Sequence, residues 1–435
     1  MQKEKIKFYK NKHFYINIVI GLSIAIASHF IENTRLGIKT LDYIFDLYIA
    51  NESDKAQENV HLEETYKNFS KDIVIVDIKY ANYKQWEFPL VTPRDVLAKI
   101  ISLADSSGAK IIIPDFFFDY HDYKTPEKDD SLRHVLTQIA NRNNTKIIFP
   151  NTIGIDGRLK PNIFNDLIEN NEKFYYALPT VVASSHDGVV RYAEDYDFYI
   201  KSIENKDSIY SKILSVPLMV SKLINNANSN KKELGVEGSV EKGNNTTKIL
   251  TEISEKKEAE NYLYNKRIRF LIVPGREDDN AVRTGNIPVE QYFQIDNIIP
   301  QYLKGKIILI GTSNPESTDN HVTPIGTIPG MYILGNAINT EIMHLNPKEV
   351  SLFIKLSVEF IVIIIASFLF LLFHELVAQI IASAIILIVL GSINYYIFYN
   401  YGVFINFILP VLVMGFHRII SEFELIISSG ISKNH

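Results

Sequence analysis

A strand, a polar loop and a helix follow one another within residues 305–343, and this unit constrains the fold more than any other stretch. The run KIILI at 306–310 is rich in β-branched and apolar side chains and ends at Gly311. Such a run is typical of a strand covered on both faces, as in a parallel sheet flanked by helices. Polar residues from Thr312 to His321 predict a loop, and residues 333–343 resume a helical pattern. The unit predicts an α/β fold with a ligand-binding edge where its strands end.

Earlier parts of the chain repeat this alternation of strands and helices. Strands are predicted where short apolar runs are bounded by turn residues, at 72–78, 110–114 and 145–149. Helices are predicted between them, at 93–106 and 129–141. Strand-helix-strand units make parallel pairs through a right-handed crossover, so we expect at least three parallel strands.

The region after the third strand is expected to make the sheet mixed. Three elements are predicted here: a hairpin of residues 174–184 and 189–192, a helix at 210–223 and a strand at 267–273. The hairpin rests on Asp187 and Gly188, a pair that suits a tight turn. Residues 225–260 are rich in polar and small residues, which predicts a mobile insertion.

Four long apolar runs flank this α/β region. Each is about as long as a bilayer core is thick, and charged side chains are rare within them. They predict one N-terminal and three C-terminal transmembrane helices, at residues 14–31, 351–374, 376–398 and 403–421. The predicted fold class is therefore α/β, with a mixed, mainly parallel sheet flanked by helices, plus four transmembrane α-helices.

The basic N-terminus determines the predicted orientation. Residues 1–13 carry five lysines and one glutamate, which is typical of a segment retained in the cytoplasm. Residues 32–350 then form an extracytoplasmic domain and residues 422–435 a cytoplasmic tail, and the lipid bilayer is a predicted partner. A cleaved signal peptide is the alternative, although no clear small-residue cleavage site follows the first apolar run.

Several kinds of chemistry have no support in the sequence. The chain has no cysteine, which excludes thiol catalysis and cysteine-ligated metal sites. It has no glycine-rich phosphate loop, no G-x-S-x-G elbow and no H-E-x-x-H pair. We therefore expect no cofactor, no resident metal and no enzymatic activity. The net charge of -5 gives no indication of a nucleic-acid partner.

Three aspartates are candidates for one shared ligand site. Asp77 and Asp115 lie at the ends of predicted parallel strands, and Asp319 lies in the loop after a third, so their carboxylates could converge at one edge of the sheet. Such a cluster suits a hard cation or a cationic ligand. The alternative is that each carboxylate caps a helix or holds a loop. Asp319 with His321 also resembles a metal-ligand pair, although this combination is frequent in loops.

Two arginines and two threonines complete the candidate ligand-binding residues. Arg94, at the start of a predicted helix, could bind a carboxylate or an anionic ligand. Arg191 follows the predicted hairpin turn and has the same two interpretations: anion binding, or neutralisation of nearby aspartates. Thr312 and Thr323 lie in the polar loop of the unit at 305–343.

A set of motifs carries a resemblance to a known family. They are DIVIVDI at 72–78, Pro93-Arg94, GAKIIIPD at 108–115, HDGVVR at 186–191, GKIILIGT at 305–312, D-x-H-x-T-P at 319–324 and PGMYILGNAINT at 329–340. With them, nearly all of residues 32–345 resembles the CHASE domain of type 2, a bacterial extracytoplasmic sensor family. Lys79 and Tyr80 depart from the acidic residues that the family tends to carry there.

The resemblance implies a role and a layout. Members are typically followed by three membrane helices that lead to a cyclase, histidine kinase or other output domain, for which residues 422–435 leave no room. We therefore expect a sensor or protein-interaction module, anchored in the bacterial inner membrane with its large domain in the periplasm. It would bind a small ligand and pass a signal to a separate partner protein. The alternatives are a structural subunit of a cell-envelope complex and a divalent-metal-dependent envelope enzyme that uses Asp77, Asp115 and Asp319.

Overall fold

The chain folds as two compact units. One consists of residues 49–346, and the other of residues 1–48 and 347–435. The computed structural model describes residues 35–58, 68–142, 144–179, 181–184, 186–204, 207–225, 266–274, 287–372 and 384–404, and a few isolated residues between 15 and 381.

A parallel sheet forms the centre of the unit at 49–346. Its six strands in the described part of the chain are β1 (Ile73–Ile78), β2 (Ile111–Pro114), β3 (Lys146–Pro150), β4 (Phe174–Ala177), β9 (Tyr292–Gln294) and β10 (Ile307–Thr312). They are ordered β4-β3-β2-β10-β1-β9 across the sheet, and each neighbouring pair is parallel. The strand predicted at 306–310 is thus β10, and it lies in the middle of the sheet.

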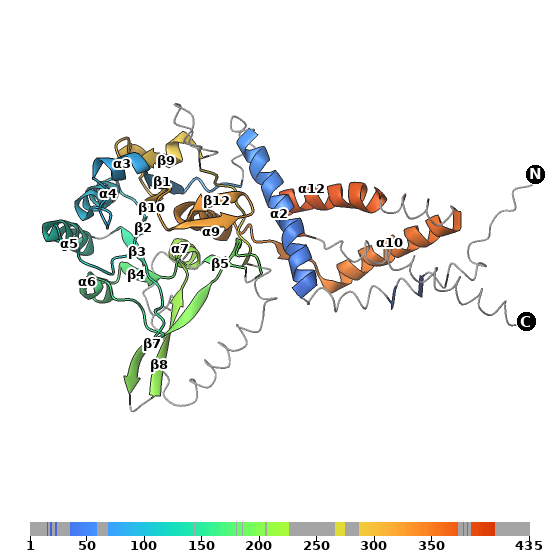
Figure 1. Cartoon of the computed structure of the whole chain (residues 1–435), viewed down its shortest axis with the longest axis horizontal. Helices are drawn as coiled ribbons and strands as arrows, with labels where there is room; N and C mark the ends of the chain where they lie inside the picture. The colour runs from blue at the N-terminus through green and yellow to red at the C-terminus, as the bar shows by residue number, and fades with distance from the viewer. Residues whose placement is uncertain are drawn as a thin grey trace, which may run out of the picture. The chain divides into compact units, whose positions relative to one another are not determined.

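Helices cover both faces of this sheet (Figure 1). On one face lie α4 (Arg94–Ser106), α5 (Pro126–Asn141) and α6 (Asn165–Glu169), and on the other lies α9 (Gly330–Ile342). Strand side chains alternate between the faces, so Val74 and Val76 join the core under α4 and α5, while Ile75 faces α9. The predictions of β1, β2, β3 and β10, of α4 and α5 and of an α/β fold with a mainly parallel sheet are confirmed.

Glycines bring α9 close to the sheet. A Cβ added to Gly311, within β10, would lie 2.6 Å from the sulfur of Met331, in the first turn of α9. A Cβ added to Gly335 would lie 3.5 Å from Leu309 and 3.6 Å from Ile75. Larger residues would push the helix away from the strands. The predicted helix at 333–343 is confirmed as α9 and begins at Gly330.

Two predictions in the middle of the chain were wrong. Within the predicted hairpin arm 174–184, β4 joins the parallel sheet, and the antiparallel hairpin consists of β5 (Val181–Ala183) and β6 (Val190–Ala193). The predicted helix at 210–223 begins only with α7 (Val216–Asn225). The residues before it form β8 (Asp207–Leu214), which pairs antiparallel with β7 (Tyr196–Glu204). Pairing with a partner strand overrode local helix propensity.

The predicted strand at 267–273 is absent as well. This segment makes an isolated bridge from Arg267 to Tyr192, but no strand of the described sheet pairs with it. Ile268 donates its N–H to the carbonyl of Arg191, and the N–H groups of Arg269, Leu271 and Ile272 are bonded to side chains of α9. The mobile insertion predicted at 225–260 lies outside the described residues, apart from Asn225.

The unit of residues 1–48 and 347–435 is held together by aromatic contacts. The helix α2 (Arg35–Glu58) contributes Phe45, whose ring lies 4.1 Å from that of Phe404 and 5.8 Å from that of Phe398. Phe404 belongs to β14 (Val403–Phe404), which pairs in parallel with β13 (Lys348–Glu349). Phe398 belongs to α12 (Gly391–Tyr401).

The prediction of four transmembrane helices is contradicted: none of the described helices is both long and apolar enough to cross a membrane. The second predicted span coincides with α10 (Leu352–Leu372), which carries the charged Lys355 and Glu359. The third contains a π-helical stretch followed by α12, whose 11 residues span about half of a bilayer core. The first and fourth, at 14–31 and 403–421, lie almost entirely outside the described residues. The predicted multi-pass inner-membrane location, which rested on these spans, is contradicted by the same finding.

Candidate functional site

Asp77, at the end of β1, is fully buried and fully bonded. Its Oδ2 accepts hydrogen bonds from the hydroxyls of Tyr292 at 2.7 Å, Ser313 at 2.8 Å and Tyr332 at 3.2 Å, and its Oδ1 accepts one from the Ser313 amide at 2.9 Å. Lys79 lies 3.1 Å from Oδ2. Burial and the neighbouring Asp77 raise the pKa of Tyr332 well above its usual value, so this phenol remains a donor. Asp77 therefore joins β1, the loop after β10 and α9, and both of its carboxylate oxygens are engaged within the fold.

A row of polar side chains on α9 continues this buried network. Asn336 is fully buried: its Oδ1 accepts the backbone N–H groups of Leu271 and Ile272, both at 2.7 Å, and its Nδ2 donates to the carbonyl of Ile272 at 2.8 Å. Thr340 accepts the N–H of Arg269 at 3.0 Å. These bonds replace the strand ladder that had been predicted for residues 267–273.

Asn339 connects the same helix to the segment before β1. Its Oδ1 accepts the N–H of Ser70 at 2.8 Å, and its Nδ2 donates to the carbonyl of Asn68 at 3.0 Å. We call Tyr332, Asn336, Asn339 and Thr340 the polar face of α9. All four are buried. A buried donor or acceptor left without a partner costs about 1–3 kcal/mol, so these bonds fix the position of α9 strongly.

A buried ion pair strengthens the connection between α9 and its surroundings. Arg269 donates from Nε to Glu52 Oε2 at 3.1 Å, and its Nη2 bonds the other carboxylate oxygen. Both side chains are at most 3% exposed. Because the N–H of Arg269 is bonded to Thr340, the end of α2 is joined to α9 through one residue.

Asp115, directly after β2, differs from Asp77. Its carboxyl group is partly buried and makes no side-chain hydrogen bond to the described residues. Burial, with a further contribution from the charge of Asp319, raises the pKa of Asp115 to about 7. The charge of Asp319 thus acts on Asp115, and the two carboxylates repel each other when both are ionised.

Asp319 and His321 lie at the start of α9. They flank the beginning of β11 (Asn320–Thr323), which forms a hairpin with β12 (Gly326–Pro329). A Cβ added to Gly330, the first residue of α9, would overlap the carboxylate of Asp319. His321 Nε2 lies 2.9 Å from Asp319 Oδ1, and this contact raises the pKa of His321. The carboxylate of Asp319 therefore lies directly against the first turn of α9.

Arg94 is structural in this arrangement. Its guanidinium is buried over the ring of Phe118 at 4.5 Å, donates to the carbonyl of Phe117 at 3.3 Å and lies 3.8 Å from Asp129. Burial lowers its pKa. The predicted alternative, neutralisation of a nearby aspartate, thus applies, but the aspartate is Asp129 rather than Asp77 or Asp115.

The other predicted residues support loops. Arg191 donates two parallel hydrogen bonds to the Asp187 carboxylate across the β5–β6 turn, from Nη1 at 2.8 Å and from Nη2 at 2.7 Å. These bonds lower the pKa of Asp187 to about 2. Thr312 donates to the carbonyl of Ile78 at 2.8 Å, and Thr323 donates to that of Gly326 at 2.6 Å.

The predicted convergence of three carboxylates is therefore reduced to two. Asp115 and Asp319 interact, whereas Asp77 is occupied by hydroxyl donors. No group of three or more His, Asp or Glu side chains that could hold a metal occurs in the described part of the chain. Sequence reasoning missed the polar face of α9, although its members lie at positions i, i+4, i+7 and i+8 of a mostly apolar helix, a spacing that places them on one side.

Comparison with known proteins gives one match. The family model of the CHASE2 domain matches residues 19–372. Neither the curated proteins nor the solved structures yield a match.

Proposed function

Because the chain belongs to the CHASE2 domain family, a family of sensor domains, we propose that its α/β unit responds to protons or a small cation at Asp115 and Asp319. The response passes through α9 to a separate partner protein that supplies the output. In this proposal the side chains bind and respond, and the domain is not an enzyme.

The observation that carries the proposal is the contrast between two carboxylates at one sheet edge. Asp77 has at least four hydrogen-bond donors, whereas Asp115 has none among the described residues. A buried carboxylate that lacks donors is stabilised by taking up a proton or by a bound cation. Asp319 contributes the second charge that such a cation would meet.

The position of Asp319 supplies the coupling to α9. Its carboxylate lies against Gly330, so a change in the repulsion between Asp115 and Asp319 acts on the first turn of the helix. The polar face of α9 is hydrogen-bonded to the segments at 68–70 and 269–272, so a displacement of the helix would also displace these segments. From the end of α9 the chain leaves the unit after Asn346.

Amide hydrogen exchange of the full chain tests this proposal. We expect exchange in residues 330–335, corrected for intrinsic rates, to be faster at pH 8 than at pH 6, since Asp115 is then ionised beside Asp319. Asp115→Asn should remove this difference, and Asp130→Asn, an exposed aspartate of α5, should preserve it. Adding Ca²⁺ at pH 8 distinguishes a cation response from a proton response. Identical exchange of the wild type at both pH values, with or without Ca²⁺, would contradict the proposal.

A further inference from the structure

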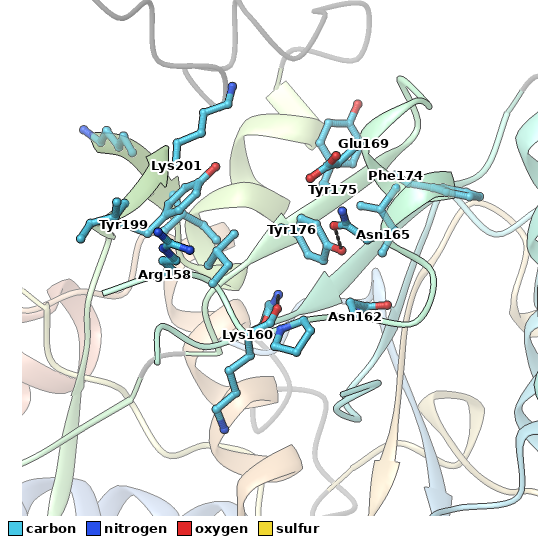
Figure 2. A pocket seen from close by; sticks show the side chains of 17 residues that line it. Arg158, Lys160, Asn162, Asn165, Glu169, Phe174, Tyr175, Tyr176, Tyr199 and Lys201 are labelled. Atoms are coloured by element: carbon cyan, nitrogen blue, oxygen red, sulfur yellow. Dashed lines mark hydrogen bonds between the residues drawn. The ribbon is translucent and has the colours of Figure 1, made fainter. Parts of the chain in front are cut away.

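A second polar site lies beside β4, the strand at one lateral edge of the sheet (Figure 2). It is a pocket of about 530 Å³ between β4, α6, the loop at 158–162 and the β7–β8 pair. Pockets of roughly 300–1,000 Å³ are typical of small-molecule sites. In Figure 2, Arg158 and Tyr199 lie on one side of the pocket, and Tyr176 and Asn165 lie on the other.

The charge of this pocket is positive. Its described lining contains four cationic side chains, Arg158, Lys160, Lys201 and Lys212, and a single carboxylate, Glu169. Lys160 is 3.8 Å from Asp119, and Lys212 lies over the ring of Tyr196. The side chains of Arg158 and Lys201 have no ion pair or hydrogen bond to the described residues. The pocket thus offers two uncommitted cations in a chain whose net charge is -5.

Neutral donors and aromatic rings make up much of the remaining wall. The hydroxyl of Tyr176 donates to Asn165 Oδ1 at 2.8 Å, which leaves the amide N–H groups of Asn165 directed elsewhere. Burial and nearby carboxylates raise the pKa of Tyr176, and burial raises the pKa of Tyr175 to about 12. Both phenols therefore remain protonated near neutral pH. Tyrosines present an apolar ring with a polar tip, which suits ligands that carry both kinds of surface.

The backbone of β4 adds a donor and an acceptor. The N–H groups of Ile147 and Asn151 donate to the carbonyls of Lys173 and Ala177, both at 2.9 Å, so alternate residues of β4 face β3. Tyr176 has the opposite orientation, and its N–H and C=O have no partner among the described residues. Leu178, which faces the same way, is already bonded to Leu214 of β8 at 2.9 Å. The free edge is therefore one residue long, too short for an added peptide strand but sufficient for one small molecule.

From these features we propose that the pocket binds a small organic anion whose carboxylate is accompanied by hydroxyl groups, the chemistry of a sugar acid. Arg158 receives the carboxylate, and Lys201, whose side chain points away from Arg158 in Figure 2, adds positive charge at the rim. Asn165, the tyrosine hydroxyls and the open backbone groups of Tyr176 receive the hydroxyl groups. The site is distinct from Asp115 and Asp319, whose charge favours the opposite kind of ligand.

The chain also connects this pocket to α9. Lys212 and Ile213 line the pocket from β8, which is followed within two residues by α7, and α7 packs against α9. We therefore expect ligand binding in the pocket to affect α9 through α7. The same helix is proposed to respond to Asp115 and Asp319.

Calorimetric titration of the full chain with D-glucuronate tests the proposal, with D-glucose as its neutral counterpart. We expect saturable binding of glucuronate and at least tenfold weaker binding of glucose. Arg158→Gln should weaken glucuronate binding about tenfold, and Lys201→Gln should weaken it less, because Lys201 lies at the rim. The matched change Lys99→Gln, at an exposed lysine of α4, should leave it unchanged.

Several results would overturn the assignment. They are the absence of saturable glucuronate binding, equal binding of glucose, equal binding of inorganic phosphate, and undiminished binding in the variant that combines Arg158→Gln with Lys201→Gln. The titration is independent of the carboxylate pair: the Asp115→Asn variant should bind glucuronate normally. If glucuronate does not bind, the proposed function is still tested separately by the pH response of α9.

Discussion

The polar face of α9 and the pocket beside β4 are both rich in polar groups, but they differ in how those groups are satisfied. Around α9, the side chains of Asn336, Asn339 and Thr340 are buried and bonded to the backbone of other segments. In the pocket, Arg158, Lys201 and the backbone of Tyr176 lack partners among the described residues. The difference separates polar groups that stabilise the fold from polar groups that remain available to a ligand. Asp115 is also available to a ligand, although its carboxyl group is partly buried.

The largest expected effect comes from Asn336→Leu. This change removes three hydrogen bonds to Leu271 and Ile272 and takes from the buried N–H and C=O of Ile272 the partner that Asn336 supplies. We expect the free energy of unfolding to fall by about 3–5 kcal/mol. Chemical denaturation of the full chain measures it. As the pocket counterpart, Asn165→Ala should cost within about 0.5 kcal/mol, because Asn165 is exposed. Equal losses in both variants would remove the distinction between the two regions.

Glu52→Gln is expected to have the next largest effect. It leaves Arg269 as a buried cation without its carboxylate, which typically costs about 3 kcal/mol. The matched exposed pair is Arg133 with Asp166, 2.7 Å apart, and Asp166→Asn should cost less than about 1 kcal/mol. Denaturation curves of the two variants give the comparison, and a loss below 1 kcal/mol for Glu52→Gln would show that this pair does not hold α2 to α9.

Asp115→Asn should change how stability depends on pH. The pKa of Asp115 in the folded chain, about 7, exceeds its usual value of 3.8, so the folded chain holds the extra proton between these values. The free energy of unfolding of the wild type should therefore fall as the pH rises from about 4 to about 7. Partial exposure reduces the effect to on the order of 1–2 kcal/mol.

The variant should lack this contribution and be more stable than the wild type at pH 8. Denaturation at pH 5 and pH 8 measures both effects, and Asp130→Asn serves as the control. If the two variants showed the same pH dependence, Asp115 would not be the group that titrates.

The smallest effect on stability is expected for Tyr176→Phe. It removes the hydroxyl that bonds Asn165 on the wall of the pocket, and we expect a change within about 0.5 kcal/mol. Glucuronate binding should nevertheless weaken severalfold by calorimetry. A large loss of stability without a loss of binding would show that Tyr176 stabilises the fold and does not contact the ligand.

The sequence predicted the parallel core because its strands are short apolar runs bounded by turn residues. β1, β2, β3 and β10 were recognised in this way. The segment at 267–273 has the same composition but bonds to Asn336 and Thr340 instead of a strand, which only tertiary structure reveals. The pocket could not be predicted either, because β4 and β8, which lie far apart in the sequence, meet there.

The apolar runs near the termini show where prediction from hydropathy fails. Hydropathy predicted continuous spans, whereas the described part of the third run is divided between a π-helical stretch and the short helix α12. Composition alone does not determine whether an apolar run forms one uninterrupted helix.

The central claim is that the charge state of Asp115 and Asp319 controls the start of α9. A ¹³C NMR titration of the Asp115 carboxyl in the full chain, with the amide signals of residues 330–335 followed in the same samples, tests it most directly. The account predicts a pKa of about 7 for Asp115, a lower value in Asp319→Asn, and α9 amide signals that shift with the Asp115 midpoint. A pKa near 4 in both proteins, or α9 signals that do not follow Asp115, would contradict it.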